Sequence, residues 1–373
     1  MPRSGSRAPT YVAVVGAGVV GAAIAYRLAA GGARVVLIEA GQPGAGTSAR
    51  SFAWLNGNDK QPPAYGQFNA DGIEAHRRLA ADLGRRDWLH ESGNLMFTDG
   101  DPAPLVARVE RLRALDYPAE LIDRRRAAAL EPSVDFDGAT ALAWFPGEAW
   151  AHGPTLVAAL VEGATGRGAA LRAGSPVTAI EARGAGVTVV AGAEPIAVDL
   201  VVIAAGRFSD RVAALAGARL PLAPTCGMLA VTGRVADGPR RVVHAPGVHF
   251  RPEPGGRLLL QDGETDQMVG PDSPEDPGRL PGCALLLERA RRRVPALRDV
   301  AVEAARVGIR PMPVDGHPVV GPVPFVPRLY LAVTHSGMTL GPLLGELVAA
   351  ELLDAAPSPR LADYRPDRCV TPL

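Results

Sequence analysis

The chain has 373 residues and is 47% hydrophobic, enough for a large core in one big domain or two closely joined ones. Its 39 basic and 39 acidic side chains balance without long runs of like charge, which argues against a nucleic-acid partner. Lys60 is the single lysine, so the positive charge is almost all arginine. Cys226, Cys283 and Cys369 are far apart and odd in number, so we expect neither a disulfide framework nor a metal site.

The first ten residues form a short polar tail without the features of a secretion signal. The apolar stretch that follows is interrupted by Gly16, Gly18, Gly21 and Arg27, which is too broken for a membrane span. We therefore expect no signal peptide, no integral membrane segment and a cytoplasmic location.

Residues 11–40 carry the most informative pattern. A β-rich run over 11–15 leads into Gly16, Gly18 and Gly21, a helical stretch covers 19–30, and a second β-rich run over 34–38 ends on Glu39. This order is typical of a dinucleotide-binding unit. Gly16 allows the tight turn, Gly18 lets the backbone approach a pyrophosphate, and Gly21 lets the helix pack against the strand. The helix N-terminus directs N–H groups and partial positive charge at the phosphates.

Glu39 stands where an acid that binds ribose hydroxyls is expected. Its carboxylate would repel a 2′-phosphate, which disfavours NADP. The pattern does not choose between NAD and FAD, and a glycine-rich turn in an unrelated α/β protein is the alternative interpretation.

The next elements are predicted to be mainly helical. Residues 41–56 are either a plain surface loop or a second phosphate-facing segment in which Thr47 and Ser48 supply hydroxyl groups. Residues 60–92 are expected to be helical, 101–131 to form two helices that stop before Pro132, and 138–150 to be β-like. A further helix is predicted over 151–169, with Pro154 near its start.

The second half is predicted to be richer in strands. A β-meander is expected over 175–206, and its last strand, 200–204, ends at Ala205 and Gly206. Regular turn residues over 221–269 predict an antiparallel sheet, and 285–298 is expected to be helical. Strand–glycine elements recur near 200–206 and 329–341, which favours two interleaved domains.

Two C-terminal segments, RVGIRPMPVDGHPVVGPV at 306–323 and LYLAVTHSGMTLGPLLGELVAAEL at 329–352, resemble the signature of the D-amino-acid-oxidase-like flavoproteins. This superfamily includes glycine and sarcosine oxidases and D-amino-acid dehydrogenases. VVIAAGRFSD at 201–210 and PLAPTCGMLAVT at 221–232 match in the same order, so the resemblance spans nearly the whole chain.

The resemblance implies an α/β fold of the glutathione-reductase-2-like kind. In it, a Rossmann-type FAD-binding domain is interleaved with a substrate domain built on an antiparallel β-sheet. The expected FAD-binding domain is discontinuous and comprises residues 10–56, 148–215 and 306–373. The expected substrate-binding domain comprises 57–147 and 216–305.

The cofactor implied by the resemblance is FAD, with its adenosine end at the N-terminal motif and its flavin ring between the domains. At the start of the last helix, the helix N-terminus would stabilise negative charge on the reduced ring. Relatives of the sarcosine-oxidase type carry a flavin-linking cysteine where this chain has Gly308, so the FAD is expected to be non-covalent. The residues expected to contact FAD are Gly16, Gly18, Val19, Val20, Glu39, Ala40, Thr47, Ser48, Val177, Ala205, Gly206, Arg310, Gly337, Met338, Thr339 and Leu340.

Arg310 is the residue that the resemblance assigns to the substrate. Its guanidinium would hold a carboxylate through two parallel hydrogen bonds. The alternative is that Arg310 neutralises a carboxylate of the protein itself. His335 and His249 are further candidates for catalytic residues, with ordinary packing as their alternative role. Trp54, Asn56 and Met228 are candidate pocket residues.

Two departures from the family pattern bear on the substrate. The segment THSGMTL at 334–340 has no counterpart of the second active-site arginine of some glycine-oxidase relatives. The strand that contains His249 lacks the tyrosine of several amino-acid oxidases. The substrate is therefore expected to be bulkier, cyclic or less polar than glycine.

The resulting hypothesis is an FAD-dependent oxidase or dehydrogenase acting on an amino acid, imino acid or related amine. Hydride transfer from the α-carbon to flavin N5 would give an imine, and oxygen or another electron acceptor would reoxidise the flavin. The lone pair of the neutral amine assists, so no side-chain base is required. The alternatives are oxidation of a 2-hydroxy acid or polyol phosphate, an NAD-dependent dehydrogenase, and a flavin-binding scaffold without turnover.

Overall fold

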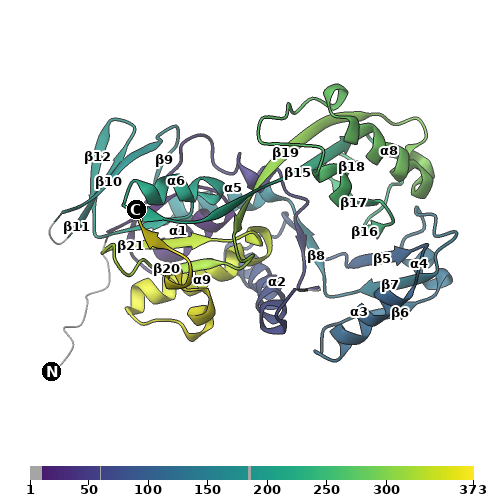
Figure 1. The fold of residues 1–373 in the computed structure, drawn as a ribbon, viewed down its shortest axis with the longest axis horizontal. Helices are drawn as coiled ribbons and strands as arrows, with labels where there is room; N and C mark the ends of the chain where they lie inside the picture. Colours follow the sequence, from purple (N-terminus) through teal and green to yellow (C-terminus); the bar gives the residue numbers. More distant parts are fainter. Residues whose placement is uncertain (1–10, 59, 184–185) are drawn as a thin grey trace.

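The computed structural model describes residues 11–58, 60–183 and 186–373, arranged in two lobes (Figure 1). The first lobe is built on a six-stranded sheet, parallel except at its β20 edge. In sheet order its strands are β20 (Val319–Pro322), β21 (Leu329–Val333), β13 (Leu200–Ile203), β1 (Tyr11–Val15), β2 (Arg34–Ile38) and β9 (Ala170–Arg172).

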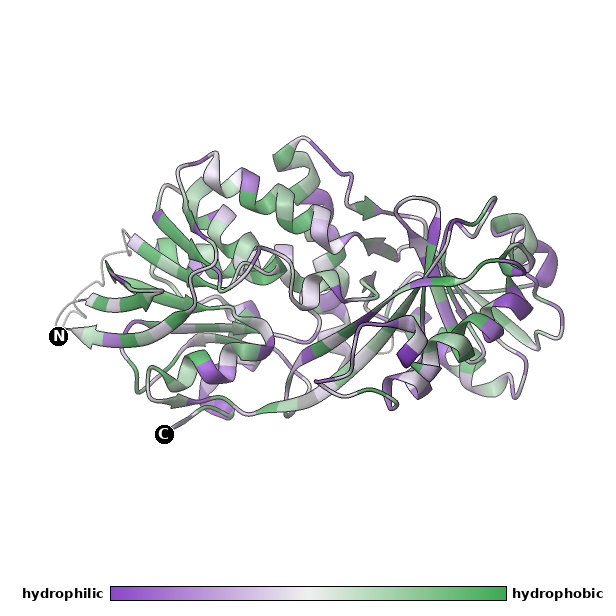
Figure 2. Ribbon diagram, turned by 90° about the horizontal axis from the view of Figure 1, so that it is seen from above, coloured by the Kyte–Doolittle hydropathy of each residue, from purple (hydrophilic) through white to green (hydrophobic). Residues whose placement is uncertain are grey.

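This sheet is covered on both faces, which explains the uninterrupted apolar runs of its strands. Val12 and Val14 of β1 face one core, whereas Ala13 and Val15 face the other. The first core is closed by α1 (Val19–Ala30), α2 (Pro63–Leu83), α5 (Gly153–Thr165) and α9 (Gly337–Asp354). The second is closed by α6 (Ser209–Ala214) and by a separate sheet of β10 (Val177–Arg183), β11 (Gly186–Ala191) and β12 (Glu194–Val198). Figure 2 shows hydrophobic residues concentrated on the strands and their covering helices.

Small residues let α1 and α9 approach closely. A Cβ atom added at Gly341 would lie 2.8 Å from Cγ2 of Val19, and one at Gly345 would lie 2.8 Å from the carbonyl oxygen of Ala23. Both distances are too short for a real side chain, so the glycines set the separation of the two helices. Their N-termini consequently lie side by side at one edge of the sheet.

The second lobe is built on an eight-stranded sheet whose strands pair antiparallel, except for the parallel pair β16 and β5. Its buried residues pack with α8 (Pro281–Arg293) in one core and with α3 (Ala103–Arg113) in a smaller one. In sheet order the strands are β19 (Val302–Pro313), β15 (Leu222–Thr232), β18 (Arg257–Gln261), β17 (Val248–Glu253), β16 (Val242–Ala245), β5 (Asn94–Thr98), β7 (Ala141–Phe145) and β6 (Glu120–Ile122).

The remaining α-helices and strands are short. They are α4 (Arg124–Leu130), α7 (Gly263–Asp266), the sheet of β3 (Trp54–Leu55), β8 (Ala149–Ala151) and β4 (Leu89–His90), and the pair β14 (Ala218–Arg219) with β22 (Thr371–Pro372). Across the described residues, no helix has the length and apolar character needed to cross a membrane.

The predicted fold class is confirmed: a Rossmann-type sheet and an antiparallel sheet are assembled from interleaved segments. The domain boundaries stay a prediction, and α2 bears on them. This helix lies in the stretch 57–147 that was expected to belong to the substrate domain. Its buried side chains, Phe68, Ile73 and Leu79 among them, nevertheless pack into the core of the six-stranded sheet.

Candidate active site

A cavity of about 410 Å³ lies at the carboxyl ends of β1, β2, β13 and β21. In open α/β sheets this edge is where ligands bind. Its wall includes the first turns of α1 and α9 and the segment after β2, from Gly44 to Ser51. The lining combines glycine, hydroxyl and carboxylate groups with apolar side chains such as Ile38, Val177 and Phe208.

The motif glycines have distinct roles. Gly16 has φ +103°, and a Cβ atom there would lie 2.5 Å from the carbonyl oxygen of Ala204. A Cβ atom at Gly21 would overlap the carbonyl oxygen of Gly16. These two glycines therefore let α1, β1 and β13 come together. Gly18 has more room, since a Cβ atom there would lie 3.4 Å from Oγ of Ser48, and it lines the cavity as Gly16 does.

Polar side chains organise the rim around α1. The Glu39 carboxylate accepts hydrogen bonds from the backbone N–H groups of Ala17 (2.8 Å) and Gly41 (2.9 Å). Oγ of Ser48 accepts one from the N–H of Val19 at 3.1 Å, which satisfies the first orphan donor of the helix. The hydroxyl of Thr47 donates to the carbonyl oxygen of Ile309 at 2.8 Å. Of the two interpretations of residues 41–56, the structure favours a segment that faces the cavity.

Helix α2 fixes the start of α9, a role that the sequence did not reveal. Nε2 of the buried His76 lies 2.8 Å from the carbonyl oxygen of Met338, and burial lowers the pKa of His76 to about 4. A Cβ atom at Gly72 would lie 2.6 Å from the carbonyl oxygen of Thr339. The neutral imidazole therefore donates to Met338 and holds this segment at the cavity.

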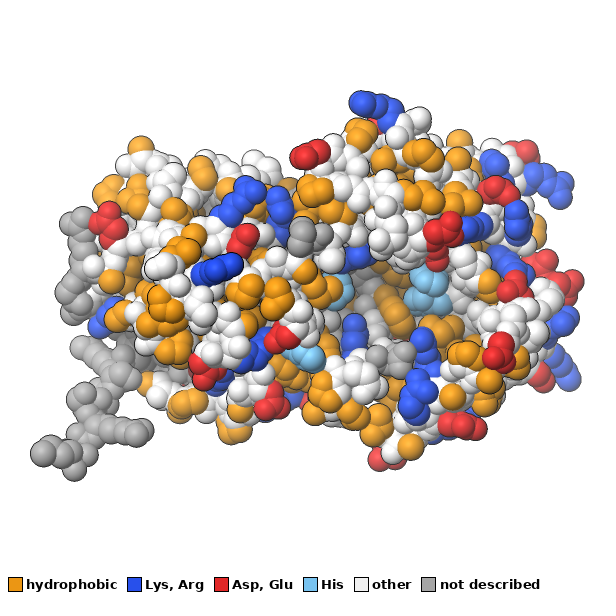
Figure 3. All heavy atoms as spheres, viewed as in Figure 1, with side chains coloured by type: hydrophobic (Ala, Val, Ile, Leu, Met, Phe, Trp, Pro, Cys, Tyr) orange, Lys and Arg blue, Asp and Glu red, His pale blue; other side chains and the backbone are white. Residues whose placement is uncertain are grey.

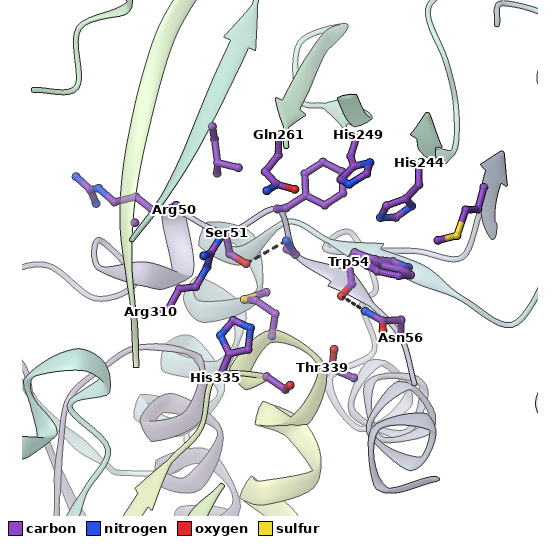
Figure 4. Close-up of a pocket in the computed structure, with 18 of the residues that line it drawn as sticks. Arg50, Ser51, Trp54, Asn56, His244, His249, Gln261, Arg310, His335 and Thr339 are labelled. Carbon is purple, nitrogen blue, oxygen red and sulfur yellow. Dashed lines mark hydrogen bonds between the residues drawn. The ribbon is translucent and has the colours of Figure 1, made fainter. Parts of the chain in front are cut away.

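A second cavity, of about 710 Å³, adjoins the first and lies between the lobes. Figure 3 shows the molecule hollowed there, with histidine side chains in the hollow. The close-up view shows the side chains that surround this pocket, which include Arg310, His335, Gln261, His249, His244, Trp54 and Asn56 (Figure 4). The two cavities share five lining residues and therefore adjoin there: Thr47, Ser51, Pro311, His335 and Met338.

Arg310 extends from β19 into this pocket and pairs with the carboxylate of Asp266. Its Nη1 also donates to the carbonyl oxygen of Cys226 at 2.8 Å. A Cβ atom at Gly227 would lie 2.9 Å from Cζ of Arg310, so this glycine makes room for the guanidinium. The Arg310 side chain keeps 30% of its surface exposed, whereas that of Asp266 keeps 6%. The guanidinium is thus anchored on its protein side and open on its pocket side.

The pocket histidines are held in the neutral form. Burial, and then the positive charges of Lys60 and Arg310, lower the pKa of His335 to about 4. Burial also lowers the pKa of His249, although Asp262 and Asp266 oppose the shift. At neutral pH these side chains therefore offer uncharged nitrogen atoms to the pocket.

Behind the pocket wall, the buried carboxylate of Glu148 accepts hydrogen bonds from Nε1 of Trp54 (2.6 Å) and the hydroxyl of Tyr117 (2.9 Å). Burial raises the pKa of Glu148 to about 7. The Trp54 ring lies 4.2 Å from that of His244, measured between centroids. Glu148 therefore fixes an aromatic wall of the pocket.

The structure brings together most of the residues singled out in the sequence. Every residue predicted to contact the cofactor lines one of the two cavities, except Leu340. Leu340 is fully buried in the core because its position on α9 turns it away from the cavity. Met228 is also buried, and it packs against Gly282 rather than lining the pocket. Lining residues that sequence reasoning missed include Phe52, Lys60, Arg108, His244 and Gln261.

Comparison with known proteins identifies the family. The model of the DAO family, described as FAD dependent oxidoreductase, matches residues 11–351. The chain belongs to this family.

Two glycine oxidase comparisons agree with this assignment. The chain is 30% identical to the glycine oxidase of Geobacillus kaustophilus in an alignment 353 residues long that covers 91% of each chain. A crystal structure of glycine oxidase from Geobacillus kaustophilus superimposes with a TM-score of 0.85 at 26% identity, covering 96% of this chain and 98% of that one. The iminodiacetate oxidase of Chelativorans sp. BNC1 shares the fold, with a TM-score of 0.82 at 24% identity over 95% and 98% of the chains.

The cofactor of this flavoprotein family is FAD, and the first cavity fits it. The α1 N-terminus and Gly18 offer a backbone cradle suited to a pyrophosphate. Glu39 stands at the end of β2, where the ribose is bound in such sheets. The α9 N-terminus and Met338 lie where the cavity opens into the second pocket, which suits a flavin ring. The individual contacts remain predictions.

Proposed function

We propose that this flavoprotein oxidises the C–N bond of an amino acid, imino acid or related amine and releases an imine. The observation that carries the proposal is the position of Arg310, anchored by Asp266 yet open to the pocket beside the predicted flavin site. A guanidinium in this position can hold a substrate carboxylate and orient the α-carbon. The glycine oxidase relative supports an amino-acid substrate.

Bound FAD supplies the acceptor for the hydride that leaves the substrate α-carbon. The residues around it bind, orient and exclude water. Arg310 fixes the carboxylate, while Trp54 and Phe52 shape the apolar wall. His335 and His249 stay neutral, so they do not repel a substrate cation on entry and can accept hydrogen bonds from an amine. The pocket lining therefore suits an amine that reacts in its neutral form without a dedicated side-chain base.

We also infer that the FAD is held without a covalent bond. Gly308, which aligns with the flavin-linking cysteine of some relatives, has no room for a side chain. A Cβ atom there would lie 2.5 Å from the carbonyl oxygen of Arg50. Acid precipitation of the holoenzyme should release all of the yellow flavin into the supernatant, and flavin retained in the pellet would contradict this inference.

Anaerobic mixing of the holoenzyme with a panel of amino acids, N-alkyl amino acids and cyclic imino acids tests the proposal. We expect at least one to bleach the flavin absorbance and to yield an imine or its hydrolysis product. Bleaching by 2-hydroxy acids or polyol phosphates alone would favour that alternative. A yellow protein that no compound bleaches would favour a flavin-binding scaffold without turnover. A colourless protein that binds NAD would favour an NAD-dependent dehydrogenase.

The proposal also covers the electron acceptor of the reduced flavin and the cellular location of the enzyme. We infer that oxygen or another acceptor reoxidises the flavin in the cytoplasm. Mixing the reduced enzyme with air-saturated buffer measures the oxygen reaction directly. Reoxidation within seconds would identify an oxidase, whereas a response only to an added dye or quinone would identify a dehydrogenase.

A further inference from the structure

The charge of the substrate pocket is one-sided. Arg50, Lys60, Arg108 and Arg310 line it, and none of the described residues that line it is an aspartate or glutamate. Arg310 is compensated by Asp266, and Arg50 by Glu275, whose Oε1 lies 2.6 Å from its Nε. The lining thus favours an anionic ligand. Its positively charged side chains differ in how far carboxylates of the protein neutralise them.

Lys60 is the cation left without a close partner. No hydrogen bond or ion pair of its ammonium group occurs within the described part of the chain. Burial lowers its pKa, and the opposing influence comes from Glu148. The Glu148 oxygens already accept hydrogen bonds from Trp54 and Tyr117. A part-buried ammonium that lacks a partner is costly, so an anion beside Lys60 would be strongly favoured.

Lys60 and Arg310 act on the same space from different parts of the fold. Lys60 precedes α2 in the first lobe, whereas Arg310 extends from β19. Both positive charges lie close enough to His335 to lower its pKa, in addition to the effect of burial. The pocket therefore presents two cationic positions around one neutral imidazole.

We propose that Lys60 anchors a second anionic group of the substrate, while Arg310 holds its α-carboxylate. The substrate class is accordingly an amino or N-alkyl amino acid that carries two carboxylates. This inference rests on the proposed function, which supplies the amine and the first carboxylate. The second contact makes Lys60 a specificity-determining residue, because a monocarboxylate leaves its ammonium unpaired in the pocket.

Binding of unreactive carboxylates to the holoenzyme tests the proposal without turnover. Acetate and butyrate would be compared with malonate, succinate and glutarate through the perturbation of the flavin absorbance. We expect at least one dicarboxylate to bind ten-fold or more tightly than the monocarboxylates. In Lys60→Met this advantage should be lost while monocarboxylate affinity changes less than three-fold, and Lys60→Arg should retain it.

Arg125→Met is the matched control, because it removes one positive charge from the exposed face of α4. It should leave all affinities unchanged. An equal loss of mono- and dicarboxylate binding in Lys60→Met would overturn the proposal, because Lys60 would then attract every anion and not the second carboxylate specifically. No loss of either would overturn it as well.

A measurement on the unchanged sequence covers the case in which the Lys60 variants do not fold. Because Lys60 is the single lysine, reductive methylation with ¹³C-formaldehyde labels only this side chain and the N-terminal amine, and keeps their charges. The dimethyl-lysine NMR signal should shift on addition of the tight dicarboxylate and not of acetate. An unmoved signal would refute the assignment. Failure of the amine panel to bleach the flavin is a separate result, which would overturn the proposed reaction.

Discussion

Arg310 on β19 and Asp266 at the end of α7 form an ion pair at the edge of the pocket between the lobes. Asp266 also accepts hydrogen bonds from the backbone N–H of Met228 (2.8 Å) and from Nε2 of Gln261 (3.1 Å). The carboxylate is thus fixed by three donors and in turn fixes the guanidinium. The two roles considered for Arg310 are therefore compatible, because one side of its fork meets the protein and the other meets the pocket.

Replacing Arg310 should weaken binding of a carboxylate substrate more than it affects retention of FAD. Loss of a charge-assisted, two-point contact costs about 2–3 kcal/mol, so Arg310→Met should raise KM roughly 30- to 150-fold. Arg310→Lys should fall in between, since an ammonium cannot reproduce the fork. Steady-state kinetics and titration with a carboxylate inhibitor measure both effects.

The double variant Asp266→Asn/Arg310→Met is the control for this prediction. Arg310→Met alone leaves Asp266 buried without its cation, which destabilises the protein. The double variant should recover stability in urea unfolding but not carboxylate affinity. Recovery of affinity would show that the single variant acted through misfolding rather than through a lost contact.

Gly21→Ala should destabilise the protein although it adds only one methyl group. The new Cβ would overlap the carbonyl oxygen of Gly16, so α1 must move away from β1. Overpacking of this kind costs about 1–3 kcal/mol, and the displaced helix should also lose FAD affinity. Gly263→Ala is the matched control, since nothing lies within 4 Å of its added Cβ. Equal urea midpoints for the two variants would contradict this account of the motif.

His76 should make stability depend on pH. The pKa of His76 is about 4 in the folded protein and near 6.5 when unfolded, so between these values the unfolded chain binds the extra proton. Stability contributed by this group is complete above pH 6.5 and falls as the pH drops, by about 2 kcal/mol at pH 5. Glutamine keeps a donor for Met338 but does not titrate. The loss of stability between pH 7.5 and 5 should therefore be about 2 kcal/mol smaller in His76→Gln than in the unchanged protein. An equal loss in the two proteins would refute this prediction.

Removal of FAD should lower the melting temperature. A ligand at 100 times its Kd stabilises the folded state by about 2.7 kcal/mol, which corresponds to roughly 3 °C for a chain of this size. Adding FAD back to the apoprotein should restore the melting temperature, whereas NAD at the same concentration should not. Differential scanning fluorimetry measures these melting temperatures. A shift produced by NAD alone would contradict FAD as the cofactor.

Much of the fold and cofactor site could be predicted because its signals are local. The glycines at 16, 18 and 21, the flanking apolar runs and Glu39 lie within thirty residues of chain, where spacing reports geometry. Family membership and the FAD cofactor, expected from the motifs, are confirmed by the family match and the glycine oxidase relatives. Leu340 lines neither cavity because the helical turn of α9, and not proximity in sequence, decides which residues face the cavity.

The dinucleotide-binding unit is encoded locally, since a βαβ turn is specified by residues that are neighbours in the chain. Two other contacts depend on the folded chain: the ion pair of Arg310 with Asp266, 44 residues away, and the hydrogen bond that joins His76 to Met338 across 262 residues. Folding also brings the single lysine into the substrate pocket. No periodicity marks such contacts, because they arise from the packing of two lobes whose segments alternate along the chain.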